Sequence, residues 1–211
     1  EPMADFFDML LLGDGEKAAA EIVRLVKECK HLSKEELLIE AARRLDFVYV
    51  PSLYDVEYEG DRIVSFTPKI GGISTKIKDA EVKDFDAAPV PAAPIVPFVQ
   101  AVHERVSIEI MRGCPGRCRF CQASFCKRPI RIRSVDTIMN IAKQSYHSTG
   151  FDTVSLLSLS TADYPHLEEL VVKLQDYFND KHVGISLPSL RVKEQLSLLP
   201  KMAASVRKSG L

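Results

Sequence analysis

The sequence has no long hydrophobic run, since no apolar stretch approaches the roughly 18–20 residues that a helix needs to cross a bilayer. Residues 1–5 also lack the basic and apolar regions of a signal peptide. Net charge is small, because 28 Lys and Arg residues stand against 29 Asp and Glu residues. A near-neutral chain has no global attraction to nucleic acid or anionic lipid. We therefore expect a cytoplasmic protein with no membrane partner.

Cysteine is scarce, with five residues in the 211-residue chain. An odd number cannot form a complete set of intramolecular disulfides, and Cys114, Cys118 and Cys121 crowd into one short stretch. This crowding is typical of metal binding in a reducing cytosol. The first residue is not Met and the chain stops abruptly after Ser209-Gly210-Leu211, so we expect a segment of a longer protein.

The first third of the sequence predicts a strand and two helices. Residues 9–12 read as a buried strand that ends in the turn Gly13-Asp14-Gly15. The helix that follows has an apolar stripe formed by Ala19, Ile22, Val23 and Val26. We interpret this as the end of a βα unit whose partner strands lie upstream of residue 1. Ser33 to Glu36 fit a capping box, and the next helix has a buried face of Leu37, Leu38, Ala41 and Leu45.

The middle of the chain predicts a hairpin and a linker. Residues 56–66 alternate in polarity around Glu59-Gly60-Asp61, which favours two antiparallel strands. Residues 87–97 contain four of the twelve prolines and cannot sustain a helix or a central strand. We therefore predict an extended linker and a domain boundary near residue 100.

The last hundred residues alternate between strand and helix patterns. Strands are predicted at residues 106–110, 153–157 and 183–187. Helices are predicted from Ser134, over about residues 165–178 and from about residue 193, and Asp163 is interpreted as a helix N-cap. Such alternation predicts an α/β fold of parallel, right-handed βαβ units, with the active site at the carboxyl ends of the strands.

A cysteine-rich loop directly follows the first of these strands, in the sequence Arg112-Gly113-Cys114-Pro115-Gly116-Arg117-Cys118-Arg119-Phe120-Cys121. Soft thiolates favour iron–sulfur clusters or zinc, and Gly113 and Gly116 permit the tight turns that wrapping a cluster requires. Three ligands for four irons leave one iron open, as in catalytic metal sites.

The C-x3-C-x2-C loop with its aromatic residue before the third cysteine resembles the radical S-adenosylmethionine (SAM) superfamily. Residues 109–114, 156–160, 187–191 and 12–16 are similar to a subfamily that carries a cobalamin-binding domain. The resemblance implies the N-terminal half of a partial (βα)6 barrel at residues 105–211. It places the last βα unit of a Rossmann-like, cobalamin-binding-type domain at residues 1–30, and a helix, a hairpin and a Pro-rich linker at residues 31–104.

The same resemblance implies the cofactors and their ligands. Cys114, Cys118 and Cys121 would hold a [4Fe-4S] cluster that cleaves SAM reductively to a 5′-deoxyadenosyl radical, an oxidoreductase-type reaction. A small electron donor such as flavodoxin or ferredoxin would supply the electron, and the subfamily adds cobalamin in the full-length protein. Further cofactor-binding residues would be Phe120, Ser158, Ser160, Ser189 and Arg191. The substrate is undefined.

Several alternatives stay open at this stage. Cys126 could be a fourth thiolate that closes a zinc site, or a small buried hydrophobe. The serines could be plain strand-end and capping residues, and Arg191 a surface arginine. Seven basic residues between Glu109 and Asp136 could attract RNA or form a solvated rim: Arg112, Arg117, Arg119, Lys127, Arg128, Arg131 and Arg133. The rival functions are a metal-stabilised RNA-binding module and an inactive fragment that lacks the remaining strands.

Overall fold

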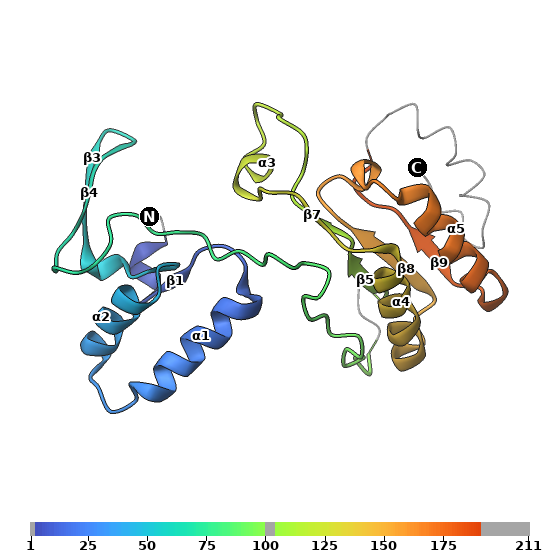
Figure 1. Ribbon diagram of the computed structural model, residues 1–211, viewed down its shortest axis with the longest axis horizontal. Coiled ribbons are helices and arrows are strands. Elements are labelled where there is room, and N and C mark those ends of the chain that lie inside the picture. The colour runs from blue at the N-terminus through green and yellow to red at the C-terminus, as the bar shows by residue number, and fades with distance from the viewer. Residues whose placement is uncertain (1–2, 100–103, 191–211) are drawn as a thin grey trace. The chain divides into compact units, whose positions relative to one another are not determined.

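The computed structural model describes residues 3–99 and 104–190 (Figure 1). The chain divides between Lys83 and Asp84 into two compact units, and each unit has its own hydrophobic core. The domain divisions after residues 30 and 104 that the resemblance implies stay predictions. None of the described helices combines the length and apolar character that a membrane span requires.

The first unit contains two helices, two short strands and a hairpin. In chain order these are the 3-10 helix η1 (Ala4–Phe6), β1 (Leu10–Leu11), α1 (Gly15–Glu28), α2 (Lys34–Arg44), β2 (Val48–Tyr49), the 3-10 helix η2 (Pro51–Leu53), β3 (Tyr54–Glu59) and β4 (Arg62–Pro68). Strand β1 pairs antiparallel with β2, with Leu10 opposite Tyr49. This partner follows β1 in the sequence, whereas the prediction that partner strands lie upstream of residue 1 stays a prediction. Two-residue strands show no alternation that would indicate a partner.

Helix α1 is present as predicted, but its buried face is rotated from the predicted stripe. The buried positions are Ala18 and Leu25, and Cys29 just beyond the helix, with Ile22 half-buried. The predicted residues Ala19, Val23 and Val26 are exposed. Both stripes are apolar and both have helical spacing, so only the packing against the rest of the unit distinguishes them.

Helix α2 begins with the predicted capping box. The Ser33 hydroxyl accepts a hydrogen bond from the Glu36 N–H (3.2 Å), and the Ser33 N–H donates to Glu36 Oε2 (2.9 Å). These bonds satisfy amide groups that a helix start would otherwise leave unpaired. They also lower the pKa of Glu36, because the bonds from Ser33 favour its charged form.

We expect Ser33→Ala to lower the free energy of unfolding of the first unit by about 1 kcal/mol, the usual cost of losing such a cap. Ser33→Asn should keep most of that stability, because Asn is also a good N-cap. Urea denaturation followed by circular dichroism measures both variants. An equal loss in both would show that the cap is not the source of the effect.

The predicted hairpin is formed by β3 and β4, which pair antiparallel from Tyr54 opposite Pro68 to Glu59 opposite Arg62. The register shifts between Glu57 and Tyr58. The ring of Tyr54 stacks on Phe66 with the ring centroids 4.5 Å apart. Both rings also contact the ring of Tyr49 in β2, with centroids 5.4 Å and 5.9 Å away, and this joins the hairpin to the core of the first unit.

The second unit is built on a three-stranded parallel sheet. Its elements are β5 (Val106–Glu109), β6 (Met111–Arg112), α3 (Ala123–Cys126), β7 (Arg131–Ile132), α4 (Val135–Thr149), β8 (Thr153–Leu157), the 3-10 helix η3 (Thr161–Asp163), α5 (Leu167–Phe178), the 3-10 helix η4 (Asn179–Lys181) and β9 (Gly184–Ser186). The sheet order is β5-β8-β9, and both pairs are parallel. The predicted α/β fold with a parallel sheet is therefore confirmed.

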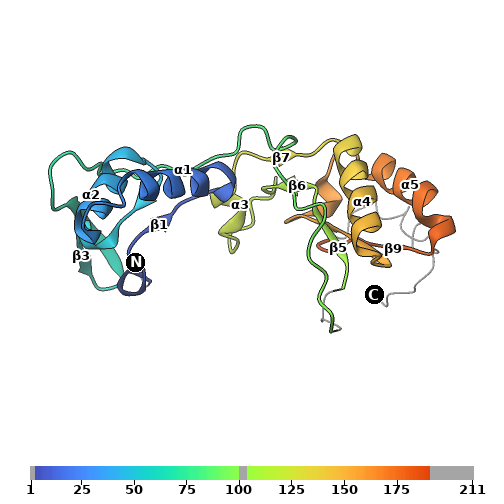
Figure 2. The ribbon, with the colours of Figure 1, turned by 90° about the horizontal axis from the view of Figure 1, so that it is seen from below.

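Helices α4 and α5 pack side by side on one side of this sheet (Figure 2). The predicted apolar face of α4 is buried, and the Ser134 hydroxyl accepts from the Thr137 N–H at its start, as predicted. Within the described residues, β9 pairs with β8 alone. The predicted helix from about residue 193 lies outside the described residues.

Residues 84–99 form no helix or strand, as the prolines predict, yet part of this segment packs tightly. Phe85 and Ala88 are buried, and Val90 packs against the core of the second unit. The Ser148 hydroxyl donates to the carbonyl of Ala92 (3.0 Å). The segment is therefore not a free linker over its whole length.

Candidate functional site

The cysteines of the C-x3-C-x2-C motif lie on one long loop, residues 113–130, here called the cysteine loop. The loop begins directly after β6 and ends at β7. These two strands pair antiparallel, Met111 with Ile132 and Arg112 with Arg131. We call this pair the neck. Because β5 ends at Glu109, the neck and its loop follow the carboxyl end of the first strand of the parallel sheet.

Backbone contacts at both ends of the neck hold its two strands together. The Arg133 N–H donates to the Ile110 carbonyl (2.9 Å), one pair beyond β6 and β7. Gly113 has φ +92°, and a Cβ at this position would collide with the Lys127 carbonyl oxygen and lie 3.2 Å from Ile130 Cα. The two ends of the loop therefore meet at a position that requires glycine.

The four thiols of the loop differ in exposure. Cys114 is only 5% exposed, Cys118 and Cys121 are half-buried, and Cys126 is exposed on α3. The Gly116 N–H donates to Cys114 Sγ (3.3 Å), the kind of bond that tunes a metal-bound thiolate. Cys29 lies apart from these four, buried in the core of the first unit.

In the described part of the chain, no three His, Cys, Asp or Glu side chains are arranged to hold a metal ion. The structure therefore places the three motif cysteines on one loop without bringing them into a formed metal site. Their chemistry fits an iron–sulfur cluster nonetheless, because they are three thiols outside any disulfide, on a loop whose two ends are fixed.

The other predicted cofactor residues occupy the loops that follow β8 and β9. The Ser158 and Thr161 hydroxyls lie 3.0 Å apart, and Thr161 donates to the Pro188 carbonyl (2.6 Å) and through its N–H to the Ser189 carbonyl (3.2 Å). These bonds join the two strand-end loops. Ser189 has φ +59°. Phe120 is 92% exposed on the cysteine loop, and Arg191 lies outside the described residues.

Ser160 and Asp163 interact with each other. Ser160 is fully buried and its hydroxyl donates to Asp163 Oδ2 (2.7 Å). The prediction that Asp163 caps the following helix was wrong, because α5 begins after His166, which makes no side-chain cap. Asp163 instead ends the 3-10 helix η3, an extra turn that the sequence pattern did not indicate.

The seven basic residues near the loop divide into two groups. Arg112, Arg128, Arg131 and Arg133 donate to groups of their own unit, such as Glu109 and the carbonyls of residues 124 and 129. Arg117, Arg119 and Lys127 are exposed. Arg112 is ion-paired with Glu109 and Arg133 is buried, so these two residues add little to the basic surface that the sequence count suggests.

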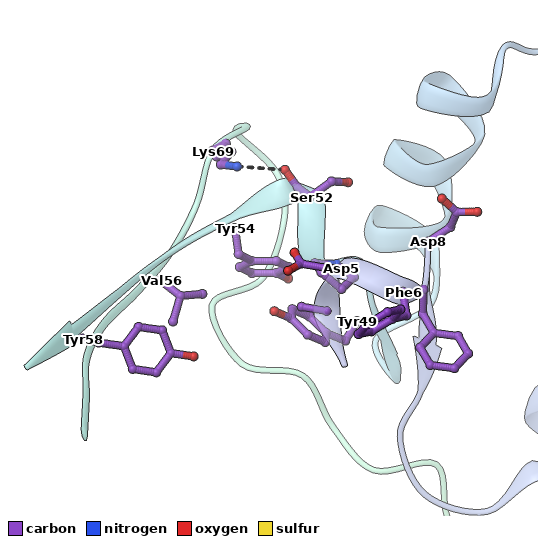
Figure 3. Close-up of a pocket in the computed structure, with 12 residues that line it drawn as sticks. Asp5, Phe6, Asp8, Tyr49, Ser52, Tyr54, Val56, Tyr58 and Lys69 are labelled. Carbon is purple, nitrogen blue, oxygen red and sulfur yellow. Dashed lines mark hydrogen bonds between the residues drawn. The ribbon is translucent and has the colours of Figure 1, made fainter. Parts of the chain in front are cut away.

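The first unit holds a separate pocket of about 550 Å³ (Figure 3). Its polar groups include Lys69, whose Nζ donates to the Ser52 carbonyl (3.0 Å), and Asp8, which pairs with Lys34 (2.7 Å). Figure 3 shows Asp5, Phe6 and Tyr49 on one side of this pocket and Tyr58 on the other. The lining comes from separate segments, so sequence analysis did not find it.

Two family models, both of radical SAM proteins, match parts of the chain. A model described as "Radical SAM superfamily" matches residues 108–208, and one described as "Radical SAM proteins, N-terminal" matches residues 1–51. An uncharacterized protein of Methanocaldococcus jannaschii is 38% identical over 84 residues, which is 40% of this chain and 18% of that protein. The match thus spans less than a fifth of that relative's length. The cysteine loop, β8 and β9 all fall within residues 108–208, the part of the chain in which the radical SAM superfamily domain is found.

Proposed function

We propose that this chain is part of a radical SAM enzyme in which Cys114, Cys118 and Cys121 hold a [4Fe-4S] cluster. One observation carries the proposal: a loop with three cysteines follows the carboxyl end of the first strand of a parallel sheet, inside residues 108–208. Ligand sites of α/β sheets lie at this end of the strands.

The residues of the loop are suited to a cluster that carries negative charge. The Arg128 side chain donates to the carbonyls of Ser124 (2.8 Å) and Gly116 (3.4 Å) and so bridges two parts of the loop. Arg117 and Arg119 flank Cys118 and bring positive charge to the thiolates. When bound, the cluster supplies an electron that cleaves SAM to methionine and a 5′-deoxyadenosyl radical.

We propose that SAM is held at the ends of β8 and β9. Ser158 and the carbonyls of residues 188 and 189 offer acceptors for an ammonium group. Ser160 is buried against Asp163, so its role would be to position this loop. Arg191 is proposed to pair with the SAM carboxylate, because a guanidinium binds carboxylates in a fork. Phe120 is proposed to contact the cofactor from the cysteine loop.

Three finer parts of the proposal rest on the sequence resemblance. The chain would belong to the subfamily with a cobalamin-binding domain, and residues 105–211 would form the first half of a partial (βα)6 barrel. A small protein such as flavodoxin or ferredoxin would deliver the electron. The radical would then abstract hydrogen from the substrate or assist methyl transfer to it.

We expect SAM to change the EPR spectrum of the reduced cluster, because its amino and carboxylate groups would occupy the open iron. The measurement uses anaerobically reconstituted full-length protein with iron, sulfide and zinc quantified first. S-adenosylhomocysteine, which lacks the sulfonium, serves as a control for 5′-deoxyadenosine formation and should give none.

A spectrum unchanged by saturating SAM, in protein with a complete four-iron cluster, would contradict an open iron site. Zinc in place of iron would favour the metal-stabilised binding module.

A further inference from the structure

We propose that residues 84–88, here called the strap, position the cysteine loop, and that Phe85 is the positioning residue. The strap precedes the first strand of the parallel sheet, and it contains none of the cysteines of the loop. Its consequence for a cluster rests on the proposed function, but its effect on the loop does not.

The ring of Phe85 contacts the side chains of Arg112 and Arg133, which lie at the two strands of the neck. It is 2% exposed, and the guanidinium carbons of Arg112 and Arg133 lie 4.8 Å and 4.3 Å from its centroid. Arg112 is in β6, two residues before Cys114, and Arg133 directly follows β7. One buried ring therefore makes cation–π contacts with both ends of the loop.

The strap also supplies acceptors for Arg133. This side chain is 2% exposed, and its Nη1 donates to the carbonyls of Asp86 and Ala88, both at 3.1 Å. Its Nε donates to the Glu109 carbonyl (3.1 Å), at the end of β5. A buried guanidinium is costly without such partners, so Arg133 ties the strap to the sheet.

Arg112 is held from two directions. Its Nε and Nη2 donate to Glu109 Oε1 (2.9 Å) and Oε2 (2.7 Å), a two-point ion pair, while its face contacts Phe85. Two-point pairing fixes the orientation of a guanidinium better than a single bond does. The backbone that leads into Gly113 and Cys114 is therefore anchored just before the loop.

The strap is itself anchored to the start of α4. Asp86 Oδ1 accepts from the Ser134 N–H (2.7 Å). Burial alone would raise the pKa of Asp86, but hydrogen bonds from Ser134 and Thr137 and the charge of Arg133 lower it overall. Burial raises the pKa of Tyr164 to about 12, so its hydroxyl stays protonated and donates to the Arg133 carbonyl (2.7 Å). At neutral pH the Asp86 carboxyl is therefore ionised and the Tyr164 hydroxyl is protonated, as these two hydrogen bonds require.

Phe85 can be tested on the full chain without any metal. Arg117 and Arg119 are exposed trypsin sites inside the loop, and cleavage there reports how often the loop opens. Loss of two cation–π contacts in Phe85→Ala should raise this cleavage rate about tenfold in apo protein. Phe85→Leu keeps apolar volume without the π face and should lie between Phe85→Ala and wild type.

The control is Phe151→Ala, which removes a half-buried ring that packs against the core of the same unit and makes none of the strap's contacts with Arg112 and Arg133. It should lower the denaturation midpoint while cleavage at Arg117 and Arg119 stays at the wild-type rate. The proposal fails if Phe85→Ala leaves loop cleavage unchanged, or if Phe151→Ala accelerates it equally.

A second measurement connects the strap to the cluster. After anaerobic reconstitution, a chelator should remove iron from Phe85→Ala about tenfold faster than from wild type, if the same two contacts limit loop opening. Equal release rates in protein with equal starting iron would overturn the effect on the cluster. If wild type assembles no iron cluster, the proposed function fails, and the cleavage comparison in apo protein still decides the role of the strap.

Discussion

Replacement of Cys114, Cys118 or Cys121 by Ala should abolish assembly of a four-iron cluster, whereas Cys126→Ala should leave it intact. Each of the three proposed thiolates would bind one iron of the cluster, and a cluster left with two thiolate ligands would lose a protein contact that retains it. Cys126 is the matched control because it is an exposed thiol on the same loop. Iron and sulfide per chain after anaerobic reconstitution, together with the visible absorption of the cluster, measure the result.

Equal loss of metal in all four variants would contradict this ligand set. It would indicate a closed four-cysteine site, and bound zinc in the wild-type protein would then identify a structural metal. Retention of iron in any one of the three ligand variants would also remove that cysteine from the set.

The regular elements of the second unit could be predicted because their periodicity is long enough to identify. Strand β8 has the predicted bounds, and α4 buries the predicted residues Val135, Ile138 and Met139. The position of the cysteine loop after the first strand was predicted on the same basis. Packing of these elements follows from their apolar faces, which are visible in the sequence.

The features that lie between those elements could not be predicted in the same way. The neck consists of two-residue strands, which have no measurable period. Phe85 lies in a polar, proline-rich segment, and its contacts with Arg112 and Arg133 depend on tertiary packing. In α1, two apolar stripes compete, and only the packed unit shows that Leu25 and not Val26 is buried. The one available signal is the cluster of arginines on both sides of the cysteines, and that cluster is equally consistent with an RNA-binding patch and with a solvated rim.

Gly113→Ala should prevent the neck from closing and should reduce cluster assembly about as severely as loss of a ligand. Two costs combine at this position. A φ of +92° is strained for any residue with a Cβ, and the added methyl would collide with the backbone of Lys127. The strain alone costs roughly 1–3 kcal/mol, and a clash with backbone cannot be relieved by a rotamer change. Iron per chain and trypsin cleavage at Arg117 and Arg119 measure the outcome.

Gly150→Ala separates the two costs. Gly150 ends α4 with φ +69°, and a Cβ there would meet nothing within 4 Å. This variant therefore carries the conformational strain without the collision, and it should lower the stability of the second unit by about 1 kcal/mol while the cluster still assembles. If both variants lose iron equally, general destabilisation explains the loss and the contact at Lys127 is not needed. If Gly113→Ala alone loses iron and its loop is cleaved faster in apo protein, closure of the neck is what prepares Cys114 and its two partner cysteines to bind a cluster.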